Sequence, residues 1–130
     1  DIAIDSSALV AILANEPECD DFLAIIANSG RRFVSAATFL ETRIVRFGKA
    51  GEPADIALHA LLRNARIEIV PVTEALADLA FDAFRRFGKG VGRPAVLKFG
   101  DCFSYALAVS TGAPLLYKGD DFALTDIAAA

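Results

Sequence analysis

Short apolar runs alternate with longer helical patterns along this chain of 130 residues, and this alternation is the strongest constraint on its fold. The runs IAI, RFVS, IEIV and PLLY suit buried strands, whereas apolar residues recur at helical spacing between them. Strands that alternate with helices form a mainly parallel sheet covered on both faces. We therefore predict an α/β protein with three-layer α/β/α architecture, in a single domain over residues 1–130.

Glycine residues and apolar patterns set the bounds of the expected elements. Gly48 is expected to end the helix that starts at residue 36, and the Gly-rich segment 88–100 is expected to form a loop. Residues 122–127 close the domain, with room for a short last strand. Strands are predicted over residues 2–4, 32–35, 67–70 and 114–117, and helices over residues 8–14, 18–27, 36–47, 54–64, 73–87 and 101–110.

Acidic residues lie beside several of these elements. Asp5 ends the first predicted strand, Asp101 begins the last long helix, and the Asp120–Asp121 pair follows the fourth strand. Ligands of open α/β sheets bind beyond the carboxyl ends of the strands, so we expect these acids to share one edge of the sheet. Glu41 lies within a helix whose neighbouring positions on the same face are apolar, so it is expected to point along a buried stripe.

Carboxylates gathered in one place repel one another unless a cation neutralises them. Two of them about 4 Å apart repel by up to about 4 kcal/mol at an effective dielectric constant of about 20. Oxygen-only ligation suits Mg²⁺ or Mn²⁺, and hydroxyls such as those of Ser7 and Thr38 would lie nearby. The pattern therefore favours a metal-dependent hydrolase of phosphodiester bonds.

Other roles remain open for individual residues. Asp5 and Asp101 each also suit a helix cap, and at least one acid of the C-terminal turn, which holds Asp120, Asp121 and Asp126, suits a solvated position. The single histidine has no supporting motif around it for a zinc site or a Ser-His-Asp triad.

Charge and hydropathy constrain the partners. A net charge of −4 argues against a sequence-independent grip on nucleic acid. The segment 85–98 contains basic residues and no acid: Arg85, Arg86, Lys89, Arg93 and Lys98. It is compatible with a solvated loop and with an edge that contacts phosphates. The 55% hydrophobic content predicts a well-buried core or a partner that covers apolar surface, for which the helices at 8–14 and 21–27 are candidates. No apolar run approaches a membrane span, and two cysteines without a secretory leader predict free thiols and a cytoplasmic location.

Four segments, taken in order, resemble PIN-domain ribonuclease toxins of the VapC type. They are IDSSALVAIL, SAATFLE, FGKGVGRPAVLKFGDCFSYALA and PLLYKGDDFALTDI, and they span nearly the whole chain. The stretch through GDCFSYALA is the most specific. The resemblance implies an endoribonuclease that uses Mg²⁺ or Mn²⁺, cuts RNA, is held inactive by a cognate antitoxin and forms a homodimer.

The resemblance also implies a set of site residues. The metal ligands and catalytic acids would be Asp5, Glu41, Asp101 and Asp121. Asp121 is favoured as the fourth acid because Phe follows it, with Asp120 as the alternative ligand and Asp126 as a further contributor. Ser7 matches a hydroxyl two positions after the first Asp, with Thr38 as a second auxiliary hydroxyl, and the RNA contacts would come from Arg85, Arg86, Lys89 and Arg93.

The chain departs from the family pattern at two places. It has Arg93-Pro94-Ala95 where the family often has His-Pro-Ala, and Lys98 where Asn is frequent. Both changes add positive charge and neither removes an expected ligand, so the RNA substrate cannot be inherited from the resemblance.

Two other functions compete with the nuclease. A PIN-like module that binds without cutting would have the same acids, and a cleavage assay with and without EDTA distinguishes it. A phosphoacceptor receiver domain would need an Asp directly after its third strand, where this chain has Pro71-Val72-Thr73.

Overall fold

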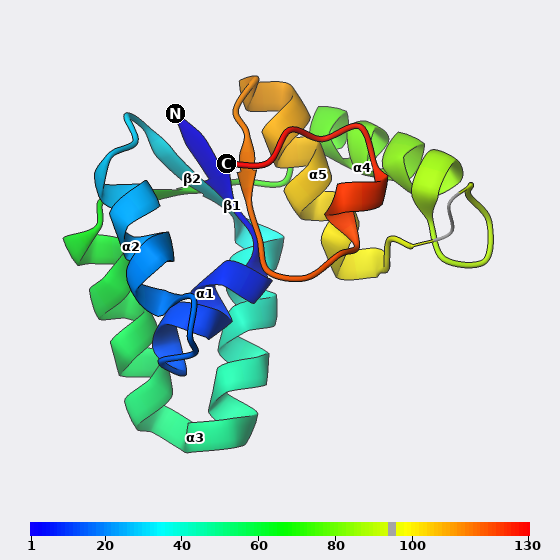
Figure 1. Cartoon of the computed structure of the whole chain (residues 1–130). Coiled ribbons are helices and arrows are strands. Elements are labelled where there is room, and N and C mark those ends of the chain that lie inside the picture. The colour runs from blue at the N-terminus through cyan, green and yellow to red at the C-terminus, as the bar shows by residue number, and fades with distance from the viewer. Residues whose placement is uncertain (94–95) are drawn as a thin grey trace.

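The computed structural model describes residues 1–93 and 96–130 and arranges them around one sheet (Figure 1). The sheet has four strands in the order β3-β2-β1-β4, and each neighbouring pair is parallel. The predicted α/β class with a parallel central sheet is therefore confirmed. The strands are β1 (Ile2–Ile4), β2 (Arg32–Ser35), β3 (Ile67–Val70) and β4 (Leu115–Leu116).

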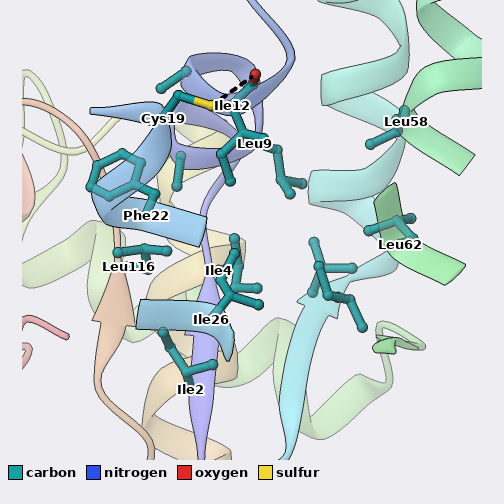
Figure 2. Close-up of a cluster of buried hydrophobic side chains, with 14 residues drawn as sticks. Ile2, Ile4, Leu9, Ile12, Cys19, Phe22, Ile26, Leu58, Leu62 and Leu116 are labelled. Carbon is teal, nitrogen blue, oxygen red and sulfur yellow. Dashed lines mark hydrogen bonds between the residues drawn. The ribbon is translucent and has the colours of Figure 1, made fainter. Parts of the chain in front are cut away.

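Helices cover both faces of this sheet (Figure 1). One face packs against α1 (Ser6–Leu13), α2 (Cys19–Ala27) and α3 (Ala36–Asn64), and the other against α4 (Glu74–Phe87) and α5 (Phe99–Thr111). The central strands have buried residues on both faces because successive strand residues point to opposite sides. Ile2 and Ile4 belong to the first core and Ala3 to the second. Figure 2 shows Ile4 with Leu9 of α1, Ile26 of α2 and Leu62 of α3 around it.

The strand order places a natural binding position after β1. The chain leaves β1 through α1 and α2 and returns as β2 on one side, whereas α4 and α5 lead to β4 on the other side of β1. The order of the sheet thus reverses at β1: the helices that follow β1 and β2 pack on one face, whereas Phe122, after β4, packs in the core of the other face. Crevices at such reversals are where open α/β sheets bind ligands.

The long helix α3 is a hairpin of two arms that meet at Gly51. This residue has φ 66° and ψ −154°, a conformation that glycine adopts readily, and Pro53 follows in the first turn of the second arm. The arms run in opposite directions (Figure 1), and Arg43 joins them by donating from Nε and Nη2 to the two carboxylate oxygens of Asp55 at 2.8 and 2.9 Å. Two helical arms were expected here, but the first runs past Gly48.

The C-terminal region contains less strand than expected. The fourth strand is only two residues long, and Phe122–Leu124 form a 3₁₀ helix, η1. A single parallel bridge between Leu115 and Ala129 takes the place of a last strand. The last long helix begins at Phe99 instead of Asp101, so Asp101 lies inside its first turn.

The apolar excess is not exposed where the sequence suggested. The expected contact helices, α1 and α2, bury Leu9, Ile12 and Phe22 in the core, because both faces of a parallel sheet need apolar cover. Exposed large apolar residues lie mainly on α3, α4 and the start of α5, including Leu40, Ile44, Phe47, Ile56, Phe81 and Phe99. None of the described helices is both long enough and apolar enough to span a bilayer.

Candidate active site

Asp5 directly follows β1, at the point where the strand order reverses, and it is only 2% exposed. Its Oδ2 accepts hydrogen bonds from the backbone N and the Oγ of Ser7 at 3.0 and 2.7 Å, and its Oδ1 accepts one from Ser104 Oγ at 2.6 Å. The bond from the Ser7 amide caps α1, so the cap that the sequence left open is present. A carboxylate has about four acceptor positions, so three donors hold it in one orientation and leave room for a cation.

Ser104 is a site residue that the sequence analysis missed. It is completely buried on α5, three positions after Asp101, and its Oγ lies 3.2 Å from the Oγ1 of Thr38 on α3. Thr38, one of the predicted auxiliary hydroxyls, therefore reaches Asp5 through Ser104. The available signal was a polar residue in an apolar helix, one turn from an expected ligand.

Ser7 connects Asp5 to the loop after β4. Its Oγ accepts a hydrogen bond from the backbone N of Lys118 at 2.9 Å while donating to Asp5. The Nζ of Lys118 pairs with Glu16 at 3.0 Å and with Glu18 at 2.8 Å. These contacts hold the start of the loop that carries the exposed Asp120 and Asp121.

Asp101 lies in the first turn of α5, where its Oδ2 accepts a hydrogen bond from the backbone N of Lys98 at 2.9 Å. Burial, together with the negative charges of Asp5, Asp121 and Glu41, raises the pKa of its carboxyl to about 6, against the opposing effect of the Lys98 amide. The four predicted acids therefore share one electrostatic environment, because the charges of three of them affect the pKa of Asp101. Asp121, and not its neighbour Asp120, is among the charges that raise this pKa.

Glu41 is half-buried on α3 and faces the start of α5. Its carboxylate lies against Gly100, and together they form part of a groove of about 310 Å³ between the two helices. The rest of the described groove wall is apolar, as expected for the α3 neighbours Ala37, Ile44 and Val45. Its other apolar residues are Leu40 of α3 and Phe99 and Phe103 of α5. Within the described residues, none of these four acids forms an ion pair with Lys or Arg.

Asp126 has different partners. Its Oδ1 accepts a hydrogen bond from the Tyr105 hydroxyl at 2.6 Å, and its Oδ2 accepts one from Arg86 Nη2 at 2.7 Å. Arg86 also donates from Nη1 to the Tyr105 hydroxyl oxygen at 3.1 Å. These bonds, led by that of Tyr105, lower the pKa of Asp126. The structure thus places two predicted residues, Asp126 and Arg86, in one hydrogen-bonded group that ties the C-terminal segment to α4 and α5.

The remaining predicted RNA contacts lie on α4 and the loop after it. Arg85 pairs with Asp82 at 3.2 Å on the exposed face of α4, while Lys89 and Arg93 are exposed in the loop. Within the Arg93-Pro94-Ala95 departure, Pro94 and Ala95 lie outside the described residues.

The spacing and donor chemistry of the acids determine whether they can hold a metal ion. Among residues 1–93 and 96–130, no three His, Cys, Asp or Glu side chains lie close enough together to form a ready-made metal cluster. Mg²⁺, however, keeps several waters and usually needs only one or two carboxylates. An oxygen-only pocket in which Asp101 is destabilised by burial and by other acids therefore fits such a cation.

Comparisons with known proteins agree with this fold. A profile of the PIN domain matches residues 2–128. The Ribonuclease VapC of Mycolicibacterium smegmatis is 48% identical over 128 residues, which cover 98% of each chain. Among solved structures, the sarcin-ricin loop cleaving toxin VapC20 of Mycobacterium tuberculosis superposes with a TM-score of 0.80 at 18% identity, over 100% of this chain and 98% of that one. A toxin-antitoxin complex from Klebsiella pneumoniae gives a TM-score of 0.70 at 18% identity, over 100% and 97% of the two chains.

At these identities, the solved structures establish a PIN-like fold. The profile match and the 48% identity establish the family, so this chain belongs to the PIN-domain proteins, among the ribonucleases of the VapC type. The resemblance identified from the sequence is confirmed. Family membership points to a divalent metal cofactor without specifying the ion.

Proposed function

We propose that this chain is a Mg²⁺- or Mn²⁺-dependent endoribonuclease and the toxin of a toxin–antitoxin pair. The observation that carries the proposal is the common environment of four acids, Asp5, Glu41, Asp101 and Asp121, at the reversal point of the sheet. Membership of the VapC ribonucleases supports RNA as the substrate. The acids would be both the metal ligands and the catalytic residues, with Asp120 as a further ligand.

The residues of the pocket divide the work. When bound, a divalent cation supplies a more acidic water and stabilises the negative charge that develops on the phosphate. Asp5 is held by three hydrogen bonds and Asp101 by the Lys98 amide, so both carboxylates are in place before RNA arrives. Such preorganisation removes the need to reorient ligands during the reaction.

An acidic pocket repels the phosphates of RNA, so positive charge must compensate. The cation provides part of it at the pocket, and Arg85, Lys89 and Arg93 would contact phosphates from α4 and its loop. Arg86 is the weakest member of this predicted set, because its guanidinium already pairs with Asp126 at 2.7 Å.

The proposal includes two protein partners. An antitoxin would cover the groove between α3 and α5 and direct a basic side chain to Glu41, which is the one charged residue among the described residues of the groove wall. Toxin–antitoxin complexes among the solved structures with this fold support such a partner. A homodimer would cover further apolar surface, such as Phe81. A cytoplasmic location fits the two cysteines, Cys19 and Cys102, which are buried free thiols.

One observation favours the alternative of a PIN-like module that does not cut. The described residues contain no preformed group of three metal-binding side chains. An RNA-cleavage assay separates this module from a nuclease.

The test measures RNA cleavage by purified protein with Mg²⁺, with Mn²⁺ and with excess EDTA. We expect EDTA to abolish cleavage, and Asp5→Asn or Asp101→Asn to reduce it by about 10²- to 10⁴-fold. Asp20→Asn, the same change at an exposed position of α2, is the matched control and should have no effect. Equal cleavage by the wild type and both pocket variants would refute the site, and no cleavage by the wild type would favour the silent module.

A further inference from the structure

We propose that Gly100 is a positioning residue for Glu41, because the absence of a side chain at residue 100 creates the space that the Glu41 carboxylate occupies. The inference rests on the proposed function, in which Glu41 is one of the working acids. It concerns a residue that makes no bond to metal or RNA itself. The proposal predicts that a single methyl group added at residue 100 displaces the Glu41 carboxylate.

The contact is unusually close. A Cβ atom built on Gly100 would lie 2.8 Å from Cδ and 3.0 Å from Oε1 of Glu41, and nearer still to Oε2. These three carboxylate atoms are its nearest neighbours outside the adjacent chain. Carbon and oxygen atoms cannot pack at such distances, so either residue 100 stays a glycine or Glu41 moves.

The backbone at residue 100 does not explain the glycine. Gly100 lies in the first turn of α5 and is not among the residues with positive φ, unlike Gly51 and Gly112. Alanine adopts helical backbone angles more favourably than glycine does. The position therefore suits a side chain in every respect except the presence of Glu41.

Glu41 is the partner that would give way. Its carboxylate terminates a flexible side chain and has no hydrogen-bond partner among the described residues, so moving it breaks no bond. The start of α5 is fixed by the bond between the Lys98 amide and Asp101. An alanine at 100 is therefore expected to leave the helix in place and to push the Glu41 carboxylate away from the other acids.

The direction of displacement is unfavourable for function. The walls around Glu41 are apolar, with Leu40, Ile44 and Phe103 beside it, and they offer no alternative polar partner. A shift of about 1 Å in a working group can reduce rates by about 10²-fold. Loss of a supporting contact at a metal site typically reduces metal affinity or activity by about 10- to 100-fold.

The experiment compares Gly100→Ala, Glu41→Asp and the double variant, with Gly48→Ala as the matched control. Gly48 also lies in a helix, and a Cβ built there meets nothing within 4 Å. Three quantities are measured: the melting temperature without metal, the affinity for Mn²⁺ alone by calorimetry, and RNA cleavage. We expect Gly100→Ala to keep a melting temperature near that of the wild type and to lose about 10- to 100-fold in Mn²⁺ affinity and cleavage. Gly48→Ala should change neither.

The double variant provides the decisive comparison. Aspartate at 41 is one methylene shorter and withdraws the carboxylate from residue 100, so adding Gly100→Ala to Glu41→Asp should cost less than about threefold, because residues in contact are not additive. Independent, multiplicative losses would overturn the proposal, as would a Gly100→Ala protein with full Mn²⁺ affinity and cleavage.

Two further outcomes are also informative. If Gly100→Ala does not fold, the proposal requires that Glu41→Ala/Gly100→Ala folds, and failure of both to fold would overturn it. If the wild type binds Mn²⁺ but does not cut RNA, the proposed function fails, whereas the Mn²⁺ affinities of the wild type and the four variants still decide the role of Gly100.

Discussion

Carboxylates in two regions of this molecule have opposite surroundings. Asp101 shares a pocket with other acids, and burial and their charges raise its pKa to about 6. Asp126 lies between Tyr105 and Arg86, and its pKa is lowered. The first arrangement is unfavourable for the protein alone and would be relieved by the proposed cation, whereas the second stabilises the fold directly. The partners of a carboxylate therefore distinguish two kinds of acid that are both Asp in sequence.

The largest expected difference is in stability without metal at neutral pH. Asp126→Ala removes two hydrogen bonds and should lower the free energy of unfolding by about 1–2 kcal/mol. Asp101→Asn removes a disfavoured charge but keeps an acceptor for the Lys98 amide, so it should raise the melting temperature while RNA cleavage is lost. Differential scanning calorimetry in EDTA measures both. Shifts of the same sign in the two variants would remove the distinction between the regions.

The pH dependence of the Asp101→Asn effect sharpens the comparison. The wild-type carboxyl titrates at an ordinary 3.8 when unfolded and at about 6 when folded. The folded wild type therefore takes up its proton first as pH falls, and it gains stability between these two values. The advantage of Asn should be full above about pH 6, decline through this window and vanish below it. Denaturant titrations in EDTA measure it, and a gain independent of pH would contradict the assigned cause.

The smallest expected effects separate the basic residues. In the inactive Asp101→Asn background, Lys89→Ala should weaken RNA binding a few-fold and reduce the slope of log affinity against log salt by about 0.7. Arg86→Ala should leave that slope nearly unchanged and lower the melting temperature, because Arg86 is paired with Asp126. Binding titrations over a range of salt concentrations test this. The opposite result would place Arg86 at the RNA and Lys89 in the fold.

Local patterns predicted the sheet well. The apolar runs identified all four strands, and Asp5 was predicted directly after the first of them, because strand ends are local features. The reversal of the strand order at β1 came from the structure. The contact between Ser104 and Asp5, and that between Gly100 and Glu41, depend on how α5 approaches other elements. The sequence pattern of one helix does not show which residues of another element it will contact.

The predictions that were incomplete share the same cause. Asp126 and Arg86 are 40 positions apart, and only the folded path of the C-terminal segment makes them a pair. Helices α1 and α2 have the composition of a contact surface but are required to cover the sheet. Burial is decided by the whole arrangement, so composition alone could not assign it.

The contacts of the Asp5 carboxylate determine when this part of the site can form during synthesis of the chain. It is oriented by Ser104, 99 positions later, and its partner Ser7 accepts a bond from the amide of Lys118, 111 positions later. A chain emerging from the ribosome lacks these donors until residues 104 and 118 have been synthesised. The Asp5 carboxylate therefore lacks its long-range support while only the N-terminal half of this sequence has been synthesised.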